Sequence, residues 1–426
     1  MASTAPTIAG VQNKGSKTNG INAKSVHLKV FIDKKKEKVM FAEADQDFVD
    51  ILFSFLTLPL GTIARLSGKH IDSSYIKIGS LSSLYESALN LDAVLTQVLF
   101  SKERLSNPIN ASSDLCRKLR LDLNDTYARV TGSHGEAVLV KKKGSFIIMD
   151  DLEVKPFLLD RYMDLRKTIA NENIELLERS MDFGFEEFLN LLRWSLLSSN
   201  PLTNLVTGGS KLYRSSSNIG NATKPYRSLS YMRNAIVNSS RPALGFSGYP
   251  QMVKILVHKS TKKVLCAQVD NFFIELLLSF LTVPLGAVKR LTMDCLPSLG
   301  IDNLYKSVSN FGAEKCLKSK AIKTALLRPK IASAYPRVTG YLPLYRSDTI
   351  FGHFINEKAT FTVSDDLKIE LSPSFATITN LTFGHPVGDI EVLDVSIGEP
   401  EALLILKASL TSASPLTDCL HAFKKK

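Results

Sequence analysis

Cysteine is scarce in this chain of 426 residues, and none of its cysteines forms a Cys-x-x-Cys pair. The five are scattered along the sequence, at Cys116, Cys266, Cys295, Cys316 and Cys419. An odd, scattered set argues against a disulfide framework and indicates reduced thiols inside a cell. The N-terminus also lacks the apolar core of an export signal. We therefore predict an intracellular protein, cytoplasmic in the first instance, with nucleus and chloroplast as alternative compartments.

Acidic residues are absent from two segments, residues 1–24 and 206–250. The first segment carries three lysines, the second carries six basic residues, and the chain ends in three more lysines. These groups together account for the whole formal net charge of +12. The remaining parts are formally neutral, which argues against a dedicated nucleic-acid-binding domain.

Apolar runs long enough to cross a membrane are missing. Residues 48–63 and 272–288 come closest, but both are shorter than the roughly 20 residues that a spanning helix needs. Each also contains an acid, Asp50 in one and Glu275 in the other. We predict two buried helices and no membrane span.

Motifs for catalysis and for cofactor binding are missing as well. No phosphate-binding loop, dinucleotide fingerprint or Gly-x-Ser-x-Gly elbow occurs, and no two histidines have metal-ligand spacing. Asp182-Phe183-Gly184 resembles the kinase magnesium triplet, but the rest of that motif set is absent, so a helix-entry turn is favoured. We predict no catalytic residue, no metal and no cofactor, although a site assembled only in three dimensions would leave no such motif.

An internal repeat is what the sequence does contain. Residues 38–66 align without a gap on residues 263–291, with 15 identities that include Ser-Phe-Leu-Thr-x-Pro-Leu-Gly. Residues 182–204 align on 396–418 with ten identities and end in Pro-Leu-Thr in both copies. This period is much longer than that of solenoid or propeller repeats, so it indicates duplication of a domain-sized unit.

The pattern within each copy indicates an α+β fold built of β-hairpins packed with apolar helices. Two short β-type runs are followed by an aspartate suited to an N-cap, Asp45 or Asp270, and then by an apolar helix. Asp150-Asp151 and Asp365-Asp366 mark turns between later strands, and Leu-rich helices precede Pro201 and Pro415. Hairpins followed by helices, without a strict βαβ alternation, are typical of α+β proteins.

We predict two homologous domains flanked by basic, disordered segments. The predicted organisation is a tail at residues 1–25, a first copy at 26–205, a linker at 206–250 and a second copy at 251–423. A fragment that ends near residue 205 is expected to fold alone, unless the two copies share one core.

Polar residues shared by the two copies are the candidates for a repeated anion site. They lie at helix ends, at Ser54, Thr57, Arg65, Ser279, Thr282 and Arg290. The structural alternative is that the hydroxyl groups bond back to the preceding helical turn, while arginine favours a helix C-terminus. This alternative is the stronger one.

The linker combines basic and aromatic residues among Ser, Asn and Gly. Such a mixture suits single-stranded RNA or DNA through charge and base stacking, or a docking segment for an acidic protein. A solvated connection is the third interpretation. The contact candidates are Lys211, Arg214, Lys224, Arg227, Arg233, Arg241, Tyr213, Tyr226 and Tyr231.

The block at residues 38–66, with Asp150-Asp151-Leu152-Glu153-Val154 and the later Pro201-Leu202-Thr203, resembles a plant family defined by domain of unknown function 674. The resemblance implies a plant protein that carries two copies of that domain. Many family members have paired cysteines in a loop after the helical block, which suggests a metal knuckle. Here that loop is contracted to Tyr-x-Arg-Val-Thr-Gly in both copies, so zinc is not expected.

These observations favour a non-catalytic intracellular interaction or regulatory protein whose partner is another protein. The first alternative is an enzyme or small-molecule binder with a pocket between the two halves. The second is weak nucleic-acid association through the linker.

Overall fold

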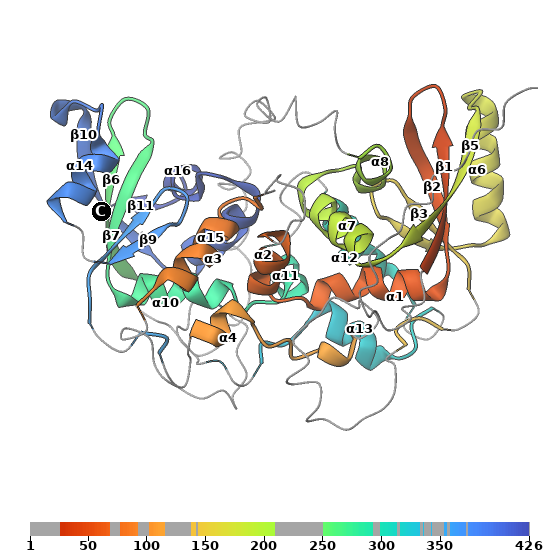
Figure 1. The fold of residues 1–426 in the computed structure, drawn as a ribbon, viewed down its shortest axis with the longest axis horizontal. Helices are drawn as coiled ribbons and strands as arrows, with labels where there is room; N and C mark the ends of the chain where they lie inside the picture. Colours follow the sequence, from red (N-terminus) through yellow and green to blue (C-terminus); the bar gives the residue numbers. More distant parts are fainter. Residues whose placement is uncertain are drawn as a thin grey trace, which may run out of the picture.

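The fold of this protein is known from a computed structural model (Figure 1). It describes residues 26–68, 77–92, 102–115, 138–141, 144–208, 250–292, 299–312, 316–332, 335, 342, 353–355, 358–371 and 374–425.

The first copy contributes a five-stranded antiparallel sheet in the order β4-β3-β2-β1-β5. Its strands are β1 (Val26–Asp33), β2 (Lys38–Ala44), β3 (Phe146–Met149), β4 (Val154–Pro156) and β5 (Leu176–Phe183). Along β1 the side chains of Leu28, Val30 and Ile32 are buried, and the residues between them face the other side. This alternation is the period-two pattern of a strand with one face on the core.

The second copy repeats this sheet in the order β11-β10-β6-β7-β8-β9. Its strands are β6 (Gln251–His258), β7 (Val264–Val269), β8 (Phe361–Ser364), β9 (Ile369–Leu371), β10 (Ile390–Ile397) and the short β11 (Lys424–Lys425). In both copies the first two strands form the predicted hairpin, and the double aspartate turns the chain between the third and fourth strands.

Most helices lie on the inner side of each sheet, and one helix of each copy lies on its outer side (Figure 1). The first copy has α1 (Gln46–Ser54), η1 (Phe55–Thr57), α2 (Leu60–Gly68), α3 (Leu81–Asn90), α4 (Lys102–Ser106), α6 (Leu159–Asn171), α7 (Phe185–Leu197) and α8 (Pro201–Val206). The second has α10 (Asn271–Phe280), α11 (Leu285–Thr292), α12 (Gly300–Asn310), α13 (Lys320–Leu327), α14 (Phe375–Thr382), η5 (Val387–Asp389), α15 (Glu399–Thr411) and α16 (Pro415–Leu420). The prediction of an α+β fold from duplicated halves is confirmed.

Helix α1 begins where the sequence predicts. Asp45 is extended and its carboxylate accepts a hydrogen bond from the Phe48 backbone N–H, which satisfies one free donor of the first turn. Asp270 holds the same N-cap position before α10. The Pro-Leu-Gly motif starts a new helix in each copy, because Leu60 and Leu285 are the first residues of α2 and α11. Each proline stands just before its helix, where its missing N–H costs little.

The repeated Ser-Phe-Leu-Thr-x-Pro-Leu-Gly motif pairs with its own second copy. The Leu60 N–H donates to the Val283 carbonyl, and the Leu285 N–H donates to the Leu58 carbonyl, both at 2.9 Å. Between these two bonds Pro59 and Pro284 face each other in an antiparallel bridge. The two bonds are equivalent in the alignment, so the motif forms a local pseudo-two-fold seam between the copies. Its strong similarity in the two copies follows from that reciprocal contact.

The motif glycines lie beside the seam, against backbone atoms of both copies. A β-carbon on Gly286 would stand 2.6 Å from the Leu326 carbonyl oxygen and 2.9 Å from that of Leu56. A β-carbon on Gly61 would stand 3.0 Å from the Leu281 carbonyl oxygen. These neighbours are backbone atoms, which cannot rotate away. Glycine is therefore required for close contact across the seam.

One helix of each copy also packs against the sheet of the other copy. Helix α12 packs against β4, α7 and α1 of the first copy, and α3 packs against β9 and α10 of the second. In Figure 1 the orange α3 lies in the half that holds the green and blue strands of the second copy.

Equivalent hydrogen bonds hold α12 and α3 against the sheets that they cover. Ser307 on α12 accepts a bond of 2.9 Å from the Val154 N–H of β4. At the matching place, Ser87 on α3 accepts one of 3.0 Å from the Ile369 N–H of β9. The helix exchange thus has the same pseudo-symmetry as the seam.

The buried apolar side chains form one continuous cluster that runs through both copies. The sequence left open whether the two copies share one core, and the structure shows that they do. The predicted boundaries at 26–205 and 251–423 stay a prediction. Independent folding of the first copy is no longer expected, because α12, which covers part of its sheet, belongs to the second copy.

Candidate functional site

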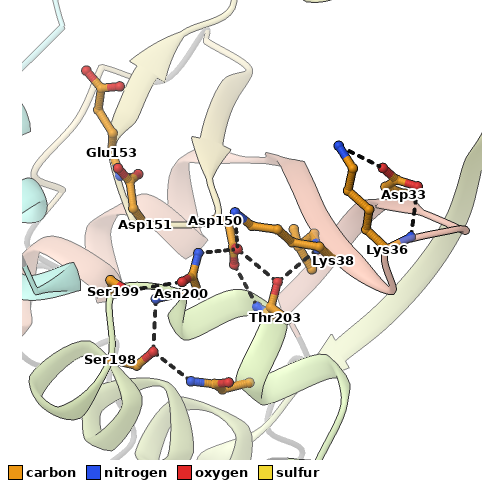
Figure 2. Close-up of polar contacts among 12 residues, drawn as sticks. Asp33, Lys36, Lys38, Asp150, Asp151, Glu153, Ser198, Ser199, Asn200 and Thr203 are labelled. Carbon is orange, nitrogen blue, oxygen red and sulfur yellow. Dashed lines mark hydrogen bonds and ion pairs between the residues drawn. The ribbon is translucent and has the colours of Figure 1, made fainter. Parts of the chain in front are cut away.

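The double aspartate and Pro-Leu-Thr, far apart in sequence, meet in a polar cluster of the first copy (Figure 2). The Asp150 carboxylate accepts hydrogen bonds from the Thr203 N–H at 2.8 Å, the Thr203 hydroxyl at 2.9 Å and the Asn200 amide at 2.8 Å. The Lys38 ammonium lies 3.9 Å away. Thr203 in turn accepts a bond from the Val39 N–H at 2.9 Å. We call this arrangement the Asp–Thr clamp.

The second copy contains the same clamp. Asp365 accepts bonds from the N–H and the hydroxyl of Thr417, at 2.8 and 2.7 Å, and Thr417 accepts one from the Val264 N–H at 2.8 Å. Burial raises the pKa of Asp150 and of Asp365, and the hydrogen bonds from Thr203 and Thr417 offset only part of this rise. Each clamp joins the start of a C-terminal helix to the β3–β4 or β8–β9 turn and to the second strand of its sheet.

The turns in the clamps contain a leucine in a left-handed conformation. Leu152 has φ 63° and Leu367 has φ 64°, and both side chains are fully buried. A bulky residue at positive φ is unusual. Here the burial of the side chain and the clamp beside it hold that conformation.

Replacing Thr203 by valine is expected to destabilise the protein by about 1–3 kcal/mol, because the Val39 N–H loses its acceptor and Asp150 loses a donor. Thr203→Ser keeps the hydroxyl group and is the matched control. Denaturant unfolding measures both. A valine variant as stable as the serine variant would contradict the role of the hydroxyl group in the clamp.

A second repeated carboxylate lies in the first core helix of each copy. Asp50 accepts bonds from the Leu139 and Val140 N–H groups at 3.0 and 2.8 Å. The aligned Glu275 accepts them from Phe354 and Ile355 at 2.9 and 2.7 Å. Burial raises the pKa of Glu275 to about 7, although both backbone bonds act to lower it. These acids hold an extended segment against the helix.

Buried cations gather near the C-terminal ends of α2 and α11. Arg193, fully buried on α7, donates to the Leu66 and Ser67 carbonyl groups at 3.2 Å each. The aligned Lys407 lies near Asp302, which also pairs with the buried Lys289. Burial alone would raise the pKa of Asp302, but the charges of the two lysines hold it below its usual value. Paired in this way, the charges fix the helices around the seam.

The predicted anion-site hydroxyl groups bond to their own helices. Ser54 and Thr57 donate to the Ile51 and Ser54 carbonyl groups at 2.6 and 2.8 Å. Ser279 and Thr282 repeat both bonds in the second copy, at 2.6 and 2.8 Å. Arg65 and Arg290 lie in the last turns of α2 and α11, partly buried. The geometry matches the structural alternative, and an anion-binding role stays a prediction.

The tail and nearly all of the linker lie outside the described residues, so their predicted disorder and the nine linker contact candidates stay predictions. Asp182-Phe183-Gly184 is the predicted helix entry, with β5 ending at Phe183 and Gly184 capping α7. Among the described residues, no group of three or more His, Cys, Asp or Glu side chains could hold a metal ion. Within the same ranges, no helix combines the length and apolarity that a bilayer crossing needs.

The sequence profile of the family described as "Protein of unknown function (DUF674)" matches residues 22–131, 127–350 and 344–426. The chain belongs to this family. No curated protein and no solved structure matched it. The motifs that resemble this family in the sequence are the same ones that form the seam and the clamps in the structure. In this chain they maintain a duplicated fold.

Sequence reasoning missed an apolar surface at the end of the second copy. Phe375 and Phe383 are 90% and 84% exposed at the two ends of α14, and Val387 of η5 is 87% exposed. We call these three side chains the α14 surface. The signal that would have found it is charge, since residues 372–388 contain no Asp, Glu, Lys or Arg. Helix α6, at the same place in the first copy, also exposes apolar side chains such as Leu159 and Met163, but it mixes them with two acids and three basic residues.

Proposed function

We propose that this DUF674 protein is a non-catalytic interaction or regulatory protein of plant cells, and that it binds a protein partner through the α14 surface. The supporting observation is the exposure of two phenylalanines and a valine within an uncharged segment. Charged residues are depleted and aromatic residues enriched at the centre of protein interfaces. An uncharged segment that exposes several large apolar side chains is a better candidate for a binding site than a single exposed leucine.

The rest of the molecule provides a fixed support for that surface. The repeated carboxylates of Asp50, Asp150, Glu275 and the partly buried Asp365 all accept hydrogen bonds from the protein's own chain. A carboxylate bound in this way at a fixed position stabilises turns and segments. This use of buried acids agrees better with a rigid scaffold than with general acid–base chemistry.

Cysteine chemistry supports a location inside the cell. Cys266 and Cys419 are free thiols in the structure, and both are buried. Burial raises the pKa of the Cys266 thiol to about 11. Unpaired, protonated thiols suit a reducing compartment, the cytoplasm first, with nucleus and chloroplast as alternatives.

Affinity capture from plant extract, with and without nuclease, tests this function. Three full-length forms are compared: the natural sequence, a Phe375→Asp/Phe383→Asp variant, and a variant with the six basic linker residues changed to glutamine. We expect a protein that survives nuclease and is retained by the linker variant, but is lost with the double aspartate variant. Circular dichroism of each form controls for folding.

Other outcomes support the alternative functions. Capture that disappears with nuclease or with the glutamine variant would place the activity in the linker, as nucleic-acid association. If all three forms capture the same proteins or none, the α14 surface is not the binding site. A small-molecule stabilisation screen would then test for a pocket between the halves. At the seam itself the backbones of the two copies are already in hydrogen-bond contact.

A further inference from the structure

Strand β10 has an open outer edge over part of its length. On one side it pairs with β6 through all eight of its residues, Ile390–Ile397. On the other side β11 pairs only with Val395 and Ser396. The described part of the chain places no strand beside residues 390–394, which we call the β10 edge. Since β11 already pairs there, the edge has the geometry to accept an antiparallel strand.

The β10 edge lacks the usual protection of edge strands. Native edges carry lysine, proline or bulges that block pairing. Residues 390–394 read Ile-Glu-Val-Leu-Asp, and their register against β6 has no bulge. The two acids are neutralised within the sheet, Glu391 by Lys262 at 2.5 Å and Asp394 by Lys254 at 3.1 Å. At the centre lies Val392, which is 59% exposed.

The equivalent edge of the first copy differs at its centre. The alignment that matches residues 182–204 with 396–418 continues back along the strands, so that Glu178 of β5 corresponds to Val392 and Arg179 to Leu393. If two β5 strands paired about this centre, Glu178 would face Glu178 of the second chain. Like charges directly opposite each other destabilise a strand pair. The β5 edge therefore disfavours the self-pairing that the β10 edge permits.

We propose that the β10 edge pairs with the β10 edge of a second copy of this chain, antiparallel about a two-fold axis through Val392. Strand β11 limits the register to residues 390–394, because pairing further along would collide with it. Val392 then faces Val392 of the second chain, and Ile390 faces Asp394. No like charges face each other in this register, and a central pair of β-branched residues is favourable.

The α14 surface lies away from the axis of this dimer. Helix α14 packs against β7, so it covers one face of the sheet, and η5 leads directly into the β10 edge. Edge-to-edge antiparallel pairing has its two-fold axis perpendicular to the sheet, so both copies of α14 lie on the same face of the joined sheet. Because the two β10 strands run antiparallel, the segments before residue 390 lie at opposite ends of the strand pair, so Phe383 and Val387 stay apart from their counterparts.

Sedimentation velocity of the purified full-length protein tests the dimer, over a concentration series up to the solubility limit. We expect a concentration-dependent species of twice the chain mass of 47.0 kDa. Val392→Lys places two lysines opposite each other and is expected to raise the dissociation constant at least about tenfold. Glu178→Lys, the same substitution type at the equivalent strand position, should leave the dimer intact.

Charge complementation separates a broken interface from a damaged fold. A mixture of Val392→Lys and Val392→Glu chains should restore dimers, because lysine then faces glutamate. Three results would overturn the proposal: a natural protein that stays monomeric throughout, a Val392→Lys protein that dimerises as before, or loss of the dimer with Glu178→Lys alone. The test uses only purified protein, so its outcome is independent of whether a plant partner binds the α14 surface.

Discussion

Gly286→Ala is expected to destabilise the protein by about 3 kcal/mol. The added β-carbon would stand 2.6 and 2.9 Å from two backbone carbonyl oxygens, those of Leu326 and Leu56, and 3.3 Å from the Pro329 ring. Backbone oxygens move only if a helix or the seam shifts. The α11 helix would have to withdraw from the first copy and strain the reciprocal bonds at Leu60 and Leu285.

Helix propensity and close packing predict opposite effects of Gly286→Ala on stability, so the measurement separates them. Alanine is a better helix former than glycine by about 1 kcal/mol, so without the close contact the same substitution in α11 would stabilise the protein. Gly388→Ala is the control, because a β-carbon there meets no atom within 4 Å. Denaturant unfolding measures both. A Gly286→Ala protein at least as stable as the natural one would show that the seam is not closely packed.

The second large effect concerns Glu275 and pH. Its side chain is buried, and its pKa is raised from 4.5 to about 7. The folded state therefore holds a proton that the unfolded state releases above pH 4.5. Stability from this group is fully present below pH 4.5 and is lost as the pH rises to about 7. The shift corresponds to about 3 kcal/mol.

Glu275→Gln removes the titration and keeps most of the shape. At pH 4.5 we expect the variant to be less stable, because an amide group offers only one oxygen to the Phe354 and Ile355 N–H groups. The difference in unfolding free energy between the natural protein and the variant should shrink by about 3 kcal/mol between pH 4.5 and pH 7.5, because only the natural protein then contains a buried charge at this position. Urea unfolding across this range measures the gap.

Glu178→Gln is the control for this comparison, because its side chain is 54% exposed and water screens its charge. A gap that stays constant with pH would show that Glu275 is ionised throughout, held in that state by its two backbone donors. A difference in unfolding free energy that grows as the pH rises would contradict a Glu275 pKa that is raised by folding.

The repeated core elements could be predicted from sequence because local signals and the duplication agree there. Strand β1 alternates between buried and more exposed residues from Leu28 to Ile32, Asp45 is a strong N-cap, and the second copy has both features. Helix α6 and strand β5 were missed. No residue of α6 is buried and most of β5 is exposed, so neither shows a clear apolar periodicity.

The exchange of α3 and α12 could not be predicted from sequence. Both helices have an apolar face, and either sheet would bury it equally well. What decides between the sheets is long-range. The seam joins the backbone at the starts of α2 and α11, and the helix that follows each of them, α3 or α12, packs on the other copy. Ser87 and Ser307 reveal the exchange only after their partners in β9 and β4 are known.

The polar residues were interpreted partly correctly for the same reason. Ser54 and Thr57 bond to local carbonyl groups, which sequence spacing within one helix predicts. The Asp150 clamp joins residues 53 positions apart, and its function as a support emerges only when Thr203 lies beside it. A repeated motif indicated importance, but its chemistry depended on contacts that no spacing encodes.

The most direct test of the interlocked fold separates the two copies. Residues 24–208 and 250–426 are produced as two fragments and their thermal unfolding is followed by circular dichroism, alone and mixed in equal amounts. We expect neither fragment to melt cooperatively as a monomer, and the mixture to recover a cooperative transition, because each fragment supplies the helix that covers part of the other's sheet. A first fragment that melts cooperatively as a monomer would contradict the shared core.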